Sequence, residues 1–179
     1  MSVSDQPIAA VNSRDAFEEF VRDRSRHLFR LALALSGWDE ATADDLLQVA
    51  LERAYRRRWV LFRDGAVAEP YVRRVLVNAA IDWRRGRRRS DEQLLMANPA
   101  DLTVPDRSAE IADRDLLMRA LRSLPPRQRA VLVMRYWEDL PDAQIAAVMN
   151  CSTVTVRTQA SRALARLREQ TGSPSARNI

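Results

Sequence analysis

Apolar residues recur at helical spacing along most of the chain, and no segment shows the alternation typical of a β-strand. The clearest pattern runs from Ala43 to Tyr55, with apolar residues at i, i+3, i+4, i+7, i+8, i+11 and i+12. Asp44 and Asp45 are expected in the first turn of this helix, where they would suit the helix dipole. The pattern predicts an amphipathic helix with one face buried.

Further helices are expected on both sides of this one. A preceding helix is predicted from a cap at Asn12 or Ser13 to about Ser36. A following helix is predicted with Pro70 in its first turn and Gly86 near its end. Four more are predicted over residues 110–122, 126–136, 141–149 and 153–168.

The fold class predicted is all-α, with two small helical domains joined by a flexible linker. The expected boundaries are a tail over 1–12, a first domain over 13–89, a polar linker over 90–108, a second domain over 109–169 and a tail over 170–179.

Residues 141–168 carry the pattern of a helix-turn-helix. Asn150 stands where the turn needs a left-handed residue, and Ser152 is a favourable N-cap for the second helix. Apolar residues on that helix fit one narrow arc, and a polar face lies opposite and beside it. That face contains Thr155, Arg157, Thr158, Ser161 and Arg162. It is typical of a helix that enters the DNA major groove, although an ordinary surface helix is the alternative.

Composition excludes several kinds of site. One histidine, one cysteine and four glycines leave no material for a structural zinc site, a disulfide framework or a phosphate-binding glycine loop. No cofactor or metal is therefore expected. The chain has no apolar run near the roughly 18 residues of a membrane span and no signal-peptide start, so a soluble, cytoplasmic protein without membrane insertion is expected.

Charge is concentrated in two blocks. All 29 basic residues are arginines. Residues 53–89 hold 12 arginines against 3 acidic residues, and residues 127–179 hold 8 against 4. Two basic blocks separated by acidic sequence predict two contacts with a polyanion, although a solvated charged surface is the alternative.

Three segments resemble the extracytoplasmic-function sigma factors of bacterial RNA polymerase, and the group they resemble most is the SigE type. They are Asp44-Asp45-Leu46-Leu47-Gln48, the run Tyr71 to Asp82, and Leu124-Pro125-Pro126-Arg127-Gln128-Arg129-Ala130-Val131-Leu132. The resemblance covers roughly residues 13–169. It implies that the first domain is sigma region 2 and the second is sigma region 4.

The resemblance also implies roles for individual residues. The residues expected to bind the clamp coiled coil of the polymerase β′ subunit are Asp44, Asp45, Leu47, Gln48 and Leu51. The loop from Leu61 to Ala68 would hold a base flipped from the −10 element. The residues expected at the −10 element are Phe62, Arg63, Asn78, Arg84, Arg85, Arg87, Arg88 and Arg89. Trp83 continues the apolar stripe of its own helix, so it is expected in the core; a wedge between bases is the alternative.

The same resemblance implies that the polar face of the last helix reads the −35 element. The expected partners are core RNA polymerase, through its β′ clamp and β flap, promoter DNA and an anti-sigma factor. Two positions depart from the family pattern. Val49 replaces a common Glu, and Val154 replaces a Gly at the start of the last helix, which leaves that start uncertain.

The leading interpretation is a non-catalytic subunit that directs polymerase to promoters. One alternative is a stand-alone helix-turn-helix regulator, which would leave the first basic block and the Asp44–Gln48 segment unexplained. A serine recombinase is a further alternative, but it needs an α/β catalytic domain, and no strand pattern precedes residue 90.

Overall fold

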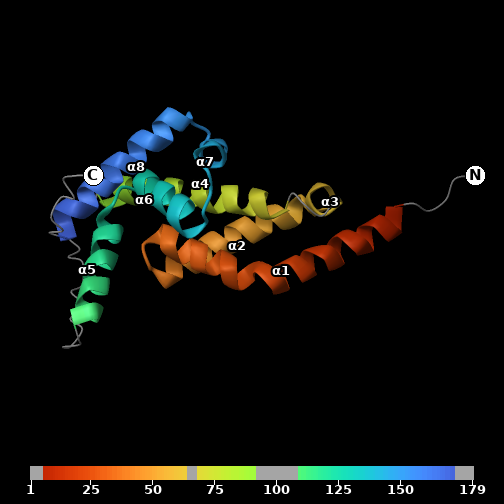
Figure 1. The fold of residues 1–179 in the computed structure, drawn as a ribbon. Coiled ribbons are helices and arrows are strands. Elements are labelled where there is room, and N and C mark those ends of the chain that lie inside the picture. The colour runs from red at the N-terminus through yellow and green to blue at the C-terminus, as the bar shows by residue number, and fades with distance from the viewer. Residues whose placement is uncertain (1–5, 64–67, 92–108, 172–179) are drawn as a thin grey trace, which may run out of the picture. The chain divides into compact units, whose positions relative to one another are not determined.

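The computed structural model describes residues 6–63, 68–91 and 109–171, and within these ranges every regular element is a helix (Figure 1). The chain divides into two compact units, residues 1–80 and 81–179. The all-helical fold class is confirmed.

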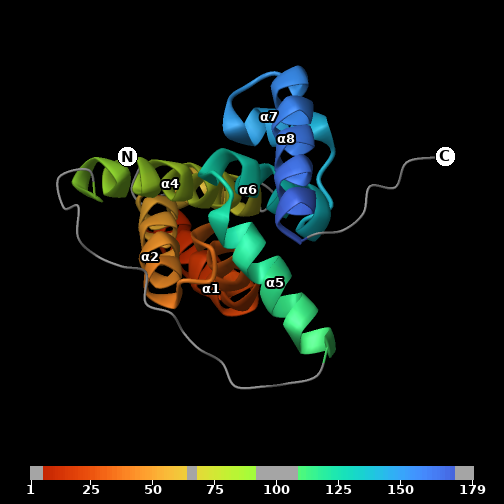
Figure 2. The ribbon, with the colours of Figure 1, turned by 90° about the vertical axis from the view of Figure 1, so that its left-hand side faces the viewer.

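Four helices belong wholly or in part to the first unit. They are α1 (Gln6–Ser36), α2 (Glu40–Arg56), α3 (Arg58–Leu61) and α4 (Ala68–Asp91). Helices α1 and α2 pack along each other (Figures 1 and 2), and α3 lies against both (Figure 1). The core residues of α1 and α2 repeat every three or four positions, and they include Leu28, Leu31, Leu35, Leu46 and Ala50. Burial of this continuous stripe is the main source of stability for two adjacent helices.

Three predicted helix boundaries are wrong. Helix α1 begins at Gln6, so Ser13 lies inside it and is buried rather than capping it. Helix α2 begins at Glu40, which places Asp44 and Asp45 in its second turn. Helix α4 continues past Gly86 to Asp91, because one glycine costs an interior turn only about 1 kcal/mol.

The second unit contains the remaining elements. They are α5 (Ala109–Ser123), α6 (Pro126–Leu132), the π-helical segment η1 (Val133–Trp137), α7 (Asp142–Met149) and α8 (Thr153–Thr171). Helix α8 packs against α5, α6 and α7. Leu124, Leu132 and Ala163 form a buried cluster, with Leu164 and Leu167 packed on it. The apolar arc predicted for the last helix therefore faces the core.

A fully buried arginine ties α5 to α6. The Arg129 guanidinium donates hydrogen bonds to the backbone oxygens of Leu121 at 2.9 Å, Arg122 at 2.6 Å and Leu124 at 3.1 Å. The last carbonyls of a helix have no partner within it, and this side chain donates to carbonyls at and just after the end of α5. Arg129 thus serves the fold of the second unit and is not exposed to a ligand.

Candidate functional site

A groove on the first unit gathers most of the residues expected to bind polymerase. It lies between α1 and α2 and is lined by Phe17, Val21, Asp44, Leu47, Gln48, Leu51, Glu52 and Tyr55. Four of the five predicted residues are in this lining, and the fifth, Asp45, is exposed on the same helix. The groove therefore combines apolar side chains with carboxylate and amide groups.

The acidic residues of α2 are not needed to cap it. The cap is Asp39, whose Oδ1 accepts a hydrogen bond from the Thr42 backbone N–H at 3.1 Å. Asp44 and Asp45 are exposed in the next turn. Asp44 and Asp45 therefore do not cap this helix.

An aromatic cluster next to the groove holds Phe62. Its ring packs edge-to-face on Phe17 and Phe20, with ring centroids 5.6 and 5.4 Å apart, and Phe17 also meets Tyr55 at 5.1 Å. Phe62 is half-buried, so part of its ring packs against α1. Contacts of this kind add about 0.5–1.5 kcal/mol each beyond area burial.

The loop expected to hold a flipped base is only partly described. Leu61 ends α3, Arg63 is exposed, and Ala68 begins α4, whereas residues 64–67 lie outside the described part of the chain. Asn78 is half-buried on α4.

Trp83 is 42% exposed, so its expected place in the core is wrong. Val72, Val75 and Leu76, which precede it on the same face of α4, are buried, so the covered part of that face ends before Trp83. The backbone of the arginine run 84–89 is helical, but its side chains lie outside the described residues.

A stacked arginine was missed by the sequence analysis. The Arg58 guanidinium lies 4.2 Å from the ring centroid of Tyr55 and 4.6 Å from that of Trp59. It also donates a hydrogen bond to the Tyr55 backbone oxygen at 3.0 Å. The sequence did carry a signal for this contact, because Arg58 follows Tyr55 by three positions and directly precedes Trp59. Cation–π contacts hold this cation beside the groove-lining Tyr55.

The helix-turn-helix forms as predicted. Asn150 adopts the left-handed conformation with φ 49° and ψ 56°, and the Ser152 Oγ accepts from the Thr155 backbone N–H at 3.1 Å. Helix α8 therefore begins directly after its predicted cap, which settles the uncertainty raised by Val154; that side chain is 67% exposed.

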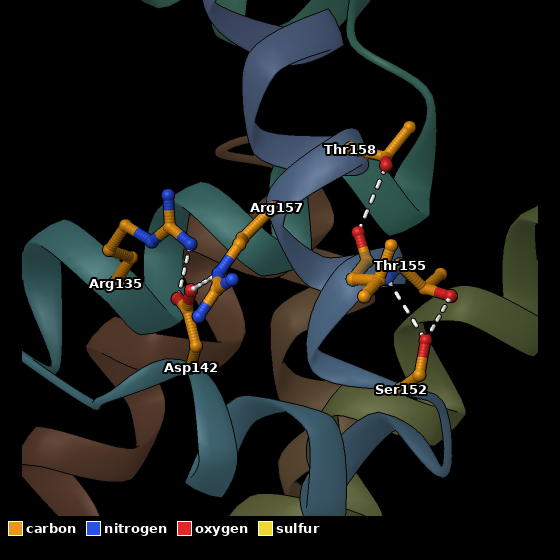
Figure 3. Close-up of polar contacts among 7 residues, drawn as sticks. Arg135, Asp142, Ser152, Thr155, Arg157 and Thr158 are labelled. Atoms are coloured by element: carbon orange, nitrogen blue, oxygen red, sulfur yellow. Dashed lines mark hydrogen bonds and ion pairs between the residues drawn. The ribbon is translucent and has the colours of Figure 1, made fainter.

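The outer face of α8 presents the predicted polar residues. Arg157, Thr158, Ser161 and Arg162 are exposed, and Thr155 is half-buried. The Thr158 Oγ1 donates to the Val154 backbone oxygen at 2.9 Å, and the hydroxyls of Thr155 and Ser152 lie 2.9 Å apart (Figure 3). The Thr158 hydroxyl is thus bonded to the helix backbone, and the Thr155 hydroxyl to the residue that caps the helix.

Asp142, the first residue of α7, receives two arginines that the sequence analysis did not connect (Figure 3). Arg135 Nη2 donates to Oδ1, and Arg157 Nε donates to Oδ2 at 3.2 Å. The hydrogen bond from Arg135, followed by that from Arg157, holds the pKa of the Asp142 carboxyl below its ordinary value of 3.8 despite the opposing effect of burial. Asp142 and Arg157 are 15 positions apart, so no short-range sequence pattern could predict that they form an ion pair.

Two kinds of feature are missing from the described residues. They contain no group of three or more His, Cys, Asp or Glu side chains placed to hold a metal ion. None of their helices is both long enough and apolar enough to cross a membrane.

The matches to known proteins extend over both units of the chain. The family model "Sigma-70, region 4" matches residues 114–167. The RNA polymerase sigma-E factor of Streptomyces avermitilis is 42% identical over 154 residues, covering 86% of this chain and 84% of that protein. The ECF RNA polymerase sigma factor SigM of Mycobacterium tuberculosis is 34% identical over 155 residues, covering 86% and 76%.

A solved structure shares the fold. The sigma factor RpoE from Bartonella quintana, crystallised in complex with the anti-sigma factor NepR, matches with a TM-score of 0.67 and 22% identity over 89% of this chain and 98% of that one. Together with the identity to the Streptomyces and Mycobacterium proteins, the region 4 match shows that this chain belongs to the extracytoplasmic-function sigma factors of RNA polymerase.

Proposed function

We propose that this chain binds core RNA polymerase through the groove between α1 and α2 and directs it to promoters. The observation that carries the proposal is the lining of the groove, where Asp44, Leu47, Gln48 and Leu51 meet in a member of the sigma family. A lining that combines apolar side chains with carboxylates suits a basic, amphipathic partner helix. The partner proposed is the β′ clamp coiled coil.

The −10 element is proposed to bind beside this groove. Arg63 is exposed and Asn78 is half-buried, so both have atoms available for a nucleotide. Phe62 would supply a ring edge while its other contacts hold it on α1. The arginines at 84, 85, 87, 88 and 89 would contact the phosphate backbone, since a basic run on one helix supplies sequence-independent affinity.

The −35 element is proposed to bind the outer face of α8. Arg162 and Thr158 would meet base edges, and Arg157 would meet a phosphate, with Thr155 and Ser161 beside them. Arg162 and Arg157 lie five residues apart, which is about 140° around a helix, so they would face different parts of the DNA major groove.

The same proposal covers the remaining partners. A β-flap contact and an anti-sigma factor are proposed by analogy with the family. The chain is proposed to act without catalytic activity of its own, in the cytoplasm where the polymerase works. A serine recombinase is not favoured because the described residues include no strand for an α/β catalytic domain. A stand-alone regulator is not favoured because it leaves the groove unused.

Run-off transcription tests the proposal. Core polymerase from Streptomyces avermitilis, whose sigma-E factor is 42% identical to this chain, is mixed with the full chain and a library of duplex templates. The templates are randomised over two blocks that are spaced as −35 and −10 elements. We expect transcripts only when the chain is present, and selected templates that share two short motifs. Transcription that does not depend on the chain, or templates without a shared motif, would contradict the proposal.

A further inference from the structure

The two ion pairs of Asp142 differ in exposure. The Arg135 and Asp142 side chains are each 24% exposed, whereas the Arg157 side chain is 70% exposed. Arg135 comes from η1, Asp142 from α7 and Arg157 from α8. The inner pair therefore fixes the carboxylate between η1 and α7, and the fixed carboxylate then holds the outer arginine.

The atom that Arg157 uses for this pair matters. It donates through Nε, which carries one of the five N–H donors of a guanidinium. The four donors on Nη1 and Nη2 remain for a ligand, in the planar fork that suits phosphate oxygens. The contact with Asp142 orients the group without using the end that a phosphate would meet.

The charge balance of the cluster also favours an anion. A carboxylate alone near DNA would repel phosphates. Here Arg135 neutralises it, so the three side chains together carry one net positive charge. Arg162, on the outer face of the same helix, has no ion-pair partner among the described residues. Arg157 is thus held in place, whereas Arg162 can adjust to its contact.

We propose that Asp142 is a positioning residue that orients Arg157 for a contact with the DNA backbone. The inference rests on the proposed function, because it needs α8 to lie in the promoter. It adds a residue outside the recognition helix to the determinants of DNA affinity. Its basis is preorganisation, since an arginine already held in its bound orientation loses less conformational freedom on binding.

The test uses the full chain assembled with core polymerase, bound to a duplex promoter taken from the selection described above. Dissociation constants are measured at several salt concentrations for the wild type, Asp142→Asn, Arg157→Ala and the double variant. Arg166→Ala, which removes another exposed arginine of α8, is the matched control.

Asp142→Asn is expected to weaken binding roughly threefold to tenfold, although it removes a negative charge, and Arg157→Ala is expected to weaken it at least as much. The double variant is expected to bind like Arg157→Ala alone, because the first effect acts through the second residue. Both single variants should make the salt dependence shallower, by up to about one unit.

Three results would overturn the proposal. Tighter binding by Asp142→Asn would show that the carboxylate masks Arg157. Equal weakening with and without Arg157 would show that Asp142 acts only on the fold. An unchanged salt slope in Asp142→Asn would show that no phosphate contact depends on it. A wild-type holoenzyme that binds no promoter would instead contradict the proposed function.

Thermal unfolding of each variant accompanies the binding measurements. If Asp142→Asn loses its cooperative transition, Arg157→Lys replaces it. This variant keeps the positive charge but cannot bond the carboxylate through Nε while presenting a fork to phosphate. We expect it to bind more weakly than the wild type. Wild-type affinity in Arg157→Lys would overturn the proposal.

Discussion

Replacement of Asp44, Asp45 and Gln48 together by alanine should leave the first unit folded and remove most of its affinity for core polymerase. All three side chains are exposed on α2, and its cap is Asp39 rather than either of these acids. Alanine has the highest helix propensity, so the helix itself gains slightly from the change. Any loss of binding therefore reports on the surface.

The expected magnitude follows from the places of the three residues. Asp44 and Gln48 line the groove, where a partner would exclude water, whereas Asp45 lies outside the lining. Truncation of one partner of a desolvated charged contact costs about 2–5 kcal/mol, and loss of a rim charge costs about 0.2–1 kcal/mol. Because Leu47 and Leu51 remain, we expect a total near 3–5 kcal/mol, which is a rise of about 150- to 4000-fold in Kd.

The assay is a fluorescence titration of the labelled full chain with core polymerase. A matched control replaces Glu19 and Asp23, two exposed acids of α1 that do not line the groove, with alanine. Its net charge changes by the same two units, so it should bind nearly as the wild type does. Equal weakening by both variants would mean that net charge, and not the groove, sets the affinity, and unchanged binding by the triple variant would refute the proposed interface.

Three further predictions concern the DNA surfaces and the fold. Asn78→Ala should impair transcription from duplex promoters without changing core binding. Phe62→Ala should impair transcription too, and it should also lower the melting temperature because the ring contacts with Phe17 and Phe20 are lost. Promoter assays measure the first effect and calorimetry the second. Arg162→Ala should cost about 1–3 kcal/mol on the preferred −35 sequence and relax one position, whereas Arg157→Ala should weaken all sequences alike; a panel of −35 variants distinguishes these outcomes. Arg129→Met should destabilise the second unit by about 3 kcal/mol in denaturant unfolding, because three carbonyl groups each lose a hydrogen bond.

Local signals gave the helix-turn-helix correctly. The left-handed turn at Asn150 and the cap at Ser152 depend on single residues and their near neighbours, so both can be predicted from a short stretch of sequence. Asp39 was missed as the α2 cap for a related reason. Asp44 and Asp45 suggested an acidic first turn, and the apolar pattern starts only at Ala43. Both observations placed the start of the helix later than its true first residue, Glu40.

Contacts between distant segments could not be predicted in the same way. Trp83 continues an apolar stripe, but whether a stripe is covered depends on a neighbouring element, and this residue is exposed. Asp142 and Arg157 meet only because the turn between α7 and α8 brings the first turn of α7 close to the second turn of α8. The groove combines Phe17 with Leu51, which no local pattern connects.

The number of arginines overstates the charge that the second unit can offer to DNA. Residues 127–179 contain 8 arginines, yet Arg129 is fully buried on three carbonyls and Arg135 neutralises Asp142. A guanidinium has five donors and remains charged in any environment, so it can cap a helix, orient a carboxylate or meet a phosphate. Only the last use releases counterions from DNA. The dependence of −35 binding on salt should therefore follow the exposed arginines of α8, and a chain rich in arginine can still make a small number of specific phosphate contacts.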